Sequence, residues 1–422
     1  MFFLFIICIL KVDNQQGMAI FKNHNVTVKQ LLGFIPEALL SNLSLNTRID
    51  HYAKVLQGNK LFYLLLYGIL DNDRLSQRTL EDTFNDSVFK MLFNLDESET
   101  IRRSSISERL SKVDPDYFKQ IYDCIYEQFS RAYTSTERKK NNLIRVDSSM
   151  VSESVGKLME GIDNKSGKKA VKYSIAFDGV LPCHSTVFTS PDYVNEDNAL
   201  PQVVREHVKK DPGHQNIYVM DRGLQSTRTI AAFSKEKITF LCRAKENRKL
   251  VELDSFITEG MKLDLGESLL VSDRKVQLYT GIPINKNGKK YYSEELVDTP
   301  FRLVIVKSKG EDQKEYWLLT NDFQSSAAEI SQAYRRRWDI EVFFRFIKQE
   351  LNASNLISLN KNGIQVMLYM TLIVAMLVLI YKKANNIGYK TAKRRFALEV
   401  RDLAIAMIVV QCGGDPGLFF KT

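Results

Sequence analysis

The 422-residue chain contains only five cysteines and five histidines, which limits how it could form disulfides or bind a metal. No two cysteines form a C-x-x-C pair; they are Cys8, Cys124, Cys183, Cys242 and Cys412. This pattern excludes a disulfide framework and a cysteine zinc site, and it fits a reducing cytoplasm. No histidine belongs to an H-E-x-x-H motif, so a catalytic metal would have to be bound by carboxylates.

Acidic residues are fewer than basic ones, with 50 Asp plus Glu against 59 Lys plus Arg. The resulting formal charge of +9 favours a polyanionic partner such as nucleic acid. Many basic proteins bind no nucleic acid, so the charge alone does not decide the question.

Long hydrophobic runs are also scarce, and two need an explanation. Residues 1–10 (MFFLFIICIL) are too few to span a bilayer, and no basic leader precedes them. We therefore interpret Met18 as the natural start and residues 1–17 as an upstream extension that is not native.

The second run, Gly363 to Tyr381, carries no charge and is long enough to cross a membrane. It is a single run near the end of a basic chain, and a helix buried on all sides reads the same way. We expect a buried helix, packed against the preceding helix that carries Glu341, and no membrane. A membrane anchor is the alternative, which cell fractionation would test.

Hydrophobic periodicity divides the chain into segments of different character. Residues 18–133 are helical and include the basic stretch 101–112, which fits a DNA-binding module or a solvated helix equally well. Residues 134–142 read as a linker, 143–246 and 323–385 as two parts of one α/β domain, 247–322 as a β-rich insertion, and 386–422 as a helical tail. The predicted fold class is therefore α/β with a β-rich insertion, preceded by an all-helical region.

The most informative stretch is YRRRWDIEVFFRFIK, residues 334–348. On one continuous helix, Tyr334, Arg337, Glu341 and Lys348 would lie within one sector of about 60°. Such a face presents an acid, two cations and a phenol together. An i,i+4 ion pair accounts for only one pair of this set.

Two aspartates are expected at strand ends. Asp147 closes the apolar segment NLIRVD, and Asp221 follows NIYVM. Each alone is more often a turn former, but ligands of an open α/β sheet gather where strands end. Two such aspartates and a helix glutamate can bind Mg²⁺, which prefers oxygen ligands.

These residues resemble DDE-type bacterial insertion-sequence transposases of the insertion sequence four family, which carry a Tyr-Arg-Glu-Lys signature. The matching segments are Val146-Asp147-Ser148, Met220-Asp221-Arg222-Gly223 and the signature Tyr334, Arg337, Glu341 and Lys348. The resemblance covers residues 143–381 and is weak over the first 130 residues. Leu224 departs from it, because many members have an aromatic residue there.

The resemblance implies a ribonuclease H-like domain that cleaves and joins DNA at terminal inverted repeats. It implies two Mg²⁺ ions, with Mn²⁺ as a substitute, bound by the catalytic residues Asp147, Asp221 and Glu341. It also implies phosphate contacts from Tyr334, Arg337 and Lys348, target DNA as a second partner, and a homodimer in the synaptic complex, in the bacterial cytoplasm.

Three alternatives remain at this point. Trp317 either stacks on an unpaired base, as the resemblance implies, or packs in a small core, as strand residues usually do. The same carboxylates would serve a ribonuclease H-like nuclease without strand transfer. An inactive, domesticated DNA-binding protein is a third reading, although the complete acidic triad argues against it.

Overall fold

The computed structural model describes residues 26–416, except 34, 94, 132, 134–141, 154–157, 159, 164–166, 259–262, 287–288 and 311–312. The expected upstream extension (1–17) and all but the last residue of the expected linker (134–142) lie outside the described residues. The chain forms two compact units. The first contains residues 1–134, 151–170 and 344–422, and the second contains 135–150 and 171–343.

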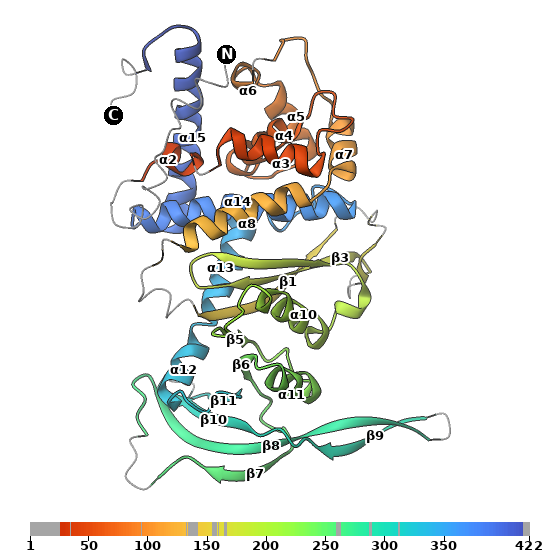
Figure 1. Ribbon diagram of the computed structural model, residues 1–422, viewed down its shortest axis with the longest axis vertical. Helices are drawn as coiled ribbons and strands as arrows, with labels where there is room; N and C mark the ends of the chain where they lie inside the picture. Colours follow the sequence, from red (N-terminus) through yellow and green to blue (C-terminus); the bar gives the residue numbers. More distant parts are fainter. Residues whose placement is uncertain are drawn as a thin grey trace. The chain divides into compact units, whose positions relative to one another are not determined.

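The first unit is mainly helical (Figure 1). Its N-terminal helices are α2 (Val28–Leu32), α3 (Glu37–Thr47), α4 (Gly58–Asp71), α5 (Gln77–Asn85), α6 (Ser87–Leu92), α7 (Arg103–Lys112) and α8 (Asp116–Ser130). The expected all-helical region is confirmed. Polar N-cap residues define where some of these helices begin: at α5, Ser76 forms a capping box with Thr79, and at α6, Asp86 accepts hydrogen bonds from two backbone amides.

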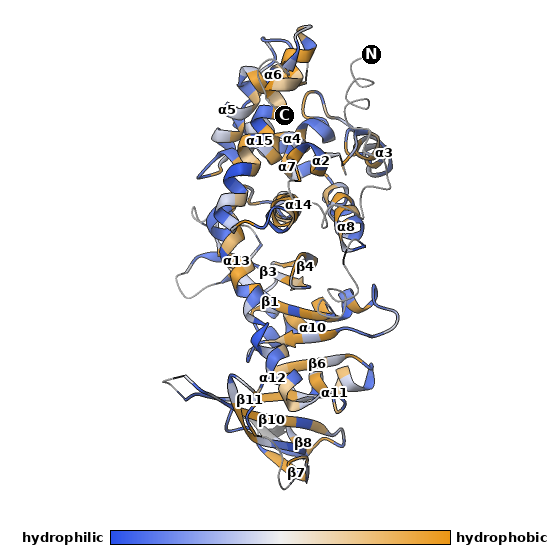
Figure 2. Cartoon of the chain, turned by 90° about the vertical axis from the view of Figure 1, so that its left-hand side faces the viewer, coloured by the Kyte–Doolittle hydropathy of each residue, from blue (hydrophilic) through white to orange (hydrophobic). Residues whose placement is uncertain are grey.

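Helix α14 (Lys361–Ala384) runs through the first unit and contains the uncharged run. It is the one described helix long and apolar enough to cross a membrane, but 89% of its most apolar window is buried. Apolar residues surround its axis in Figure 2, as the core helix of a globular unit requires. Its main neighbours are α8, α15 (Tyr389–Gln411), α7 and α4, whereas the sequence suggested the helix carrying Glu341.

The second unit is built on a mixed sheet with the order β3-β1-β5-β6-β11-β10-β8-β7. Its strands are β1 (Leu143–Ser152), β3 (Lys169–Phe177), β4 (Pro182–Phe188), β5 (Ile217–Met220), β6 (Thr239–Arg243), β7 (Leu250–Ser255), β8 (Ser268–Lys286), β9 (Lys289–Leu296), β10 (Phe301–Ser308) and β11 (Glu315–Thr320). Strand β4 pairs with β3, β9 with β8, and the short β2 (Ile162–Asp163) of the first unit with the start of β3.

Two of the central strands, β5 (IYVM) and β6 (TFLCR), are short and mostly buried. β1 pairs in parallel with β5, and β5 in parallel with β6. The crossovers between them are α10 (Glu196–Val208) and α11 (Thr227–Lys235), each begun by a side-chain N-cap, Asn195 and Ser226 respectively. This arrangement of strands and helices confirms the α/β fold class.

The β-rich segment is continuous with this sheet. β11 pairs antiparallel with β6, and β10 joins β11 to β8. Arg302 of β10 and Asp273 of β8 form a buried ion pair with two hydrogen bonds of 2.9 and 2.8 Å. The segment inserted in the sequence therefore extends the central sheet.

Candidate active site

The two candidate aspartates lie at the end of the β1–β5 pairing. The parallel register ends with Val146 opposite Met220, so Asp147 and Asp221 are the next residues on adjacent strands. Adjacent strands lie about 4.8 Å apart, which makes the two aspartates neighbours. The sequence placed Asp147 at a strand end, but β1 continues to Ser152. Asp147 is instead the first residue of β1 beyond its pairing with β5.

The signature residues do not lie on one continuous helix, and this part of the prediction is wrong. Tyr334 is in α12 (Ala327–Arg335), whereas Glu341 and Lys348 are in α13 (Trp338–Glu350). The intervening turn is tight: the amides of Arg337 and Asp339 donate to carbonyls three residues back, at 3.0 and 3.1 Å. Arg337 lies in this turn.

Arg337 contacts two of the three candidate carboxylates. Its Nη2 donates to Glu341 Oε1, and its Nη1 lies 3.9 Å from Asp147 Oδ2. The hydroxyl of Tyr334 donates to Asp221 Oδ1 over 3.5 Å, and the Arg337 guanidinium lies 5.9 Å from the centre of the Tyr334 ring. Two of the four signature residues thus connect all three acids.

Arg145 anchors the start of α13 and was missed in the sequence analysis. It is 3% exposed, and its guanidinium donates to Asp339 Oδ2 at 2.8 Å and to the carbonyl of Arg336 at 3.1 Å. A third bond reaches the carbonyl of Asp178 at 2.8 Å. The sequence feature that could have identified it is a charged residue inside the otherwise apolar segment NLIRVD, two residues before Asp147. Both side chains leave β1 on the same face.

Gly179 makes room for this anchor. Its φ is +100°, which favours glycine, and a Cβ there would lie 2.7 Å from Arg145 Nη1. Any larger residue would displace the guanidinium, so the turn after β3 belongs to the support of the site.

The electrostatics of Asp147 are unusual for an aspartate. Its pKa is raised to about 6, chiefly by burial and also by nearby Glu196 and Asp221, against the lowering effects of the Ser148 amide and Arg337. In this environment a neighbouring cation stabilises the ionised form of the carboxyl group. Perturbed carboxyl groups of this kind gather at functional sites.

A cavity of about 510 Å³ opens beside Asp221. Four cations from several elements line it, Arg243, Lys309, Arg335 and Arg337, together with the acid Glu267, which pairs with Arg335. Tyr316, Tyr334 and Trp338 add aromatic surface, and the Arg243 guanidinium lies 4.7 Å from the centre of the Tyr316 ring. Such a lining suits a polyanion that also offers flat rings.

Two predicted DNA-contact residues lie elsewhere. Trp317 neighbours Tyr316 on β11, and alternate strand residues face opposite sides, so Trp317 points away from the side that lines this cavity. It is half-buried, and no partner for its buried Nε1 is found in the described residues. Lys348 lies two turns beyond Glu341 on α13, in the part of the helix that belongs to the first unit.

The three carboxylates are of the ligand type that a divalent cation prefers, but their side chains are not arranged as a complete metal site. Among the described residues, no group of three or more His, Cys, Asp or Glu side chains is placed to hold a metal. Asp147 and Glu341 nevertheless share one cation, the Arg337 guanidinium. A hard metal ion would find oxygen ligands at this position once that guanidinium withdrew.

A comparison with known proteins agrees with this geometry. The family model described as the transposase DDE domain matches residues 138–377. A protein named as a transposase for insertion sequence element IS5377 of Geobacillus stearothermophilus is 27% identical over 65% of this chain and 66% of its own length. Another, named for element IS4SA of Synechocystis, is 24% identical over 82% of this chain and 87% of its own length.

Among solved structures, a piggyBac transposase synaptic complex with hairpin DNA aligns over 96% of this chain and 83% of its own, with 10% identity. The TM-score of this alignment is 0.44. The family model covers more than half of the chain, including Asp147, Asp221 and Glu341. The chain belongs to the family of transposases with a DDE domain.

Proposed function

We propose that this protein cuts DNA at the inverted-repeat ends of an insertion sequence and joins the ends to target DNA. The observation that carries the proposal is the meeting of Asp147, Asp221 and Glu341 around Arg337 and Tyr334. Asp147 lies in β1, Asp221 directly follows β5, and Glu341 lies in the first turn of α13. One of them, Asp221, lines a cavity together with four cations and Glu267.

Asp147, Asp221 and Glu341 are proposed to bind two Mg²⁺ ions, with Mn²⁺ as a substitute. DDE transposases use divalent metal ions, which supply a nucleophile and stabilise the leaving oxygen in phosphodiester displacement. The protein's part is to hold the carboxylates and the DNA in register. Arg145 supports this by fixing the α12–α13 turn.

Arg337, Tyr334 and Lys348 are proposed to contact the DNA backbone. Arg337 and Tyr334 line the cavity together with Arg243, Lys309 and Arg335, which supports binding of phosphates there. Trp317 remains a candidate for base stacking, but Tyr316 is the aromatic residue of β11 that faces the cavity. We further propose a homodimer that holds two DNA ends in the bacterial cytoplasm.

A reconstituted reaction tests this proposal. Purified protein, Mg²⁺, a duplex ending in the element's inverted repeat and a supercoiled target plasmid should give cleaved ends and joined products. Cleavage without joining would identify the second candidate, a ribonuclease H-like nuclease. Neither product, from protein that binds the repeat, would favour a domesticated DNA-binding protein.

A further inference from the structure

A fourth carboxylate, Glu196, lies behind the two aspartates. Glu196 is the first residue of α10, and its side chain is 29% exposed. It accepts a hydrogen bond of 2.9 Å from the hydroxyl of Ser148, the residue directly after Asp147. Ser148 also shares a hydrogen bond of 2.7 Å with Ser174 of β3. Because alternate residues of a strand face opposite sides, this network lies on the face of β1 opposite to Asp147.

A buried lysine holds Glu196 in place. Lys172 of β3 is 1% exposed, and its Nζ donates to Glu196 Oε1 at 3.0 Å and to the carbonyl of Val194 at 2.7 Å. A buried lysine needs a paired anion, so this interaction restricts Glu196 to one position. The neighbouring Ser174 on the same face of β3 restricts Ser148 in turn.

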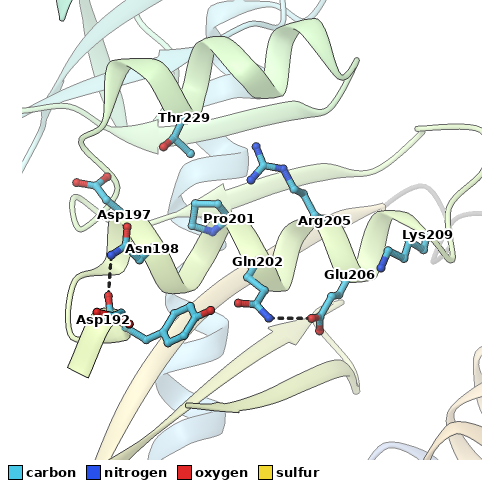
Figure 3. Close-up of a pocket in the computed structure, with 10 residues that line it drawn as sticks. Asp192, Asp197, Asn198, Pro201, Gln202, Arg205, Glu206, Lys209 and Thr229 are labelled. Carbon is cyan, nitrogen blue, oxygen red and sulfur yellow. Dashed lines mark hydrogen bonds between the residues drawn. The ribbon is translucent and has the colours of Figure 1, made fainter. Parts of the chain in front are cut away.

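Glu196 also touches the segment that follows Asp221. A Cβ at Gly223 would lie 2.8 Å from Glu196 Cγ and 3.0 Å from its Cβ, so the glycine allows this close approach. The next residue of α10 continues the contact: Asp197 Oδ1 accepts from the amides of Gln225 and Ser226 at 2.6 and 2.7 Å. Figure 3 shows Asp197 and Asn198 at the start of α10, with Thr229 of α11 across the same hollow.

The contact of Glu196 with both segments matters because the pairing of β1 with β5 does not extend to Asp147 and Asp221. The β1–β5 register ends at Val146 and Met220, one residue before the two aspartates. Two neighbouring carboxylates repel one another, and the ladder does not extend to hold their segments together. Glu196 contacts both segments from behind.

We propose that Glu196, fixed by Lys172, is a positioning residue that sets the spacing of the Asp147 and Asp221 segments before metal or DNA binds. This inference rests on the proposed function, because it assigns a supporting role in that same site. It predicts that loss of Glu196 affects the chemical step and metal binding more than DNA affinity.

The test compares Glu196→Ala and Glu196→Gln with the wild type at saturating repeat DNA. Supporting partners of metal ligands typically contribute about 10–100-fold, so Glu196→Ala should lower kcat by roughly that factor. Binding of repeat DNA without metal should change less than about threefold. Glu196→Gln should recover only part of the rate, since its amide oxygen can accept from Ser148 and its length fills the space beside Gly223, but it leaves buried Lys172 without a paired anion.

Two further variants keep the test decisive. Glu206→Gln removes a carboxylate from the same helix, where it bonds His184, and should leave cleavage unchanged. If Glu196→Ala does not fold, Gly223→Ala replaces it and should reproduce the loss of kcat. Combined with Glu196→Gln, its effect should not be additive, because the two residues are in contact.

Metal binding supplies a readout that does not depend on cleavage. Mn²⁺ should raise the thermal midpoint of the wild type without DNA, and Glu196→Ala should need a higher Mn²⁺ concentration for the same rise. A folded Glu196→Ala protein with wild-type kcat and an unchanged Mn²⁺ response would overturn the inference. If the wild type itself does not cleave repeat DNA, the proposed function fails, and the Mn²⁺ response still tests the role of Glu196.

Discussion

Nη1 of Arg337 lies 3.9 Å from Oδ2 of Asp147, while Nη2 of the same side chain donates to Glu341. A guanidinium therefore occupies the position where two proposed metal ligands face one another. Positive charge from the protein and from a metal ion would compete for the same carboxylates.

Removal of Arg337 should therefore strengthen metal binding while weakening DNA binding. We expect Arg337→Ala to bind Mn²⁺ roughly fivefold more tightly, since a partly exposed ion pair contributes about 1 kcal/mol. Isothermal titration of the DNA-free protein measures this change. Arg337→Lys should keep the metal affinity low but not restore DNA binding fully, because a lysine cannot make a bidentate phosphate contact. An unchanged Mn²⁺ affinity in Arg337→Ala would show that no competition exists.

Asp147 should destabilise the metal-free fold. Its pKa is raised to about 6 from an ordinary 3.8, so the folded state prefers the protonated form and loses stability as the pH rises from about 4 to 6. Asp147→Asn should then be more stable than the wild type by about 1–3 kcal/mol at pH 8, with little difference below pH 4. Urea unfolding at both pH values measures this.

Glu206 provides a control of opposite sign. Its pKa is lowered to about 2, chiefly by the hydrogen bond with His184, so its stabilising effect is present near neutral pH and lost in acid. Glu206→Gln should be less stable than the wild type at pH 8. A destabilised Asp147→Asn protein at pH 8 would contradict the raised pKa of Asp147 in the folded state.

Arg145 should be needed for the placement of Glu341. Arg145→Ala removes bonds to Asp339 and to the carbonyls of Arg336 and Asp178, and it should lower stability by about 2–4 kcal/mol. Cleavage by the remaining folded protein should also fall. Arg205→Ala breaks the exposed Arg205–Glu236 pair and should change stability by under about 1 kcal/mol. Equal effects of the two substitutions would rule out the anchoring role.

Lys348 should contact a phosphate, which a salt series can show. Each phosphate contact contributes a slope of about −0.9 to log K against log salt on duplex DNA. Lys348→Ala should reduce the slope by about one contact and change sequence preference little, because backbone contacts position but do not specify. Parallel lines for wild type and Lys348→Ala would mean that Lys348 touches no phosphate.

The sequence alone predicted the parts of this site that depend on local pattern. Apolar segments ending in Asp147 and Asp221 predicted a strand before each residue; β1 continues past Asp147, and both aspartates come directly after the last β1–β5 pair. The break between Tyr334 and Glu341 was not predictable from periodicity, which carries no information on contacts with residues distant in sequence, such as Arg145, which donates to the carbonyl of Arg336. Glu196 gave no local signal either, since its partners Ser148 and Lys172 are distant in sequence.

The long β-rich segment shows the same limit. Its alternating residues predicted strands correctly, but pairing of β11 with β6 depends on contacts across about 80 residues, which single-segment patterns do not contain. The buried state of α14 was predicted from composition. Its neighbours were not, because a helix apolar on all sides carries no directional signal.

The central claim is that Asp147, Asp221 and Glu341 act as one catalytic set. Its most direct test is cleavage of repeat DNA by Asp147→Ala, Asp221→Ala and Glu341→Ala, with affinity for the same DNA measured in parallel without metal. Each variant should lose cleavage by several orders of magnitude, because residues that act as a unit fail together, while its affinity stays near that of the wild type. Cleavage that survives any one of the three substitutions, or affinity that falls in step with cleavage, would contradict the claim.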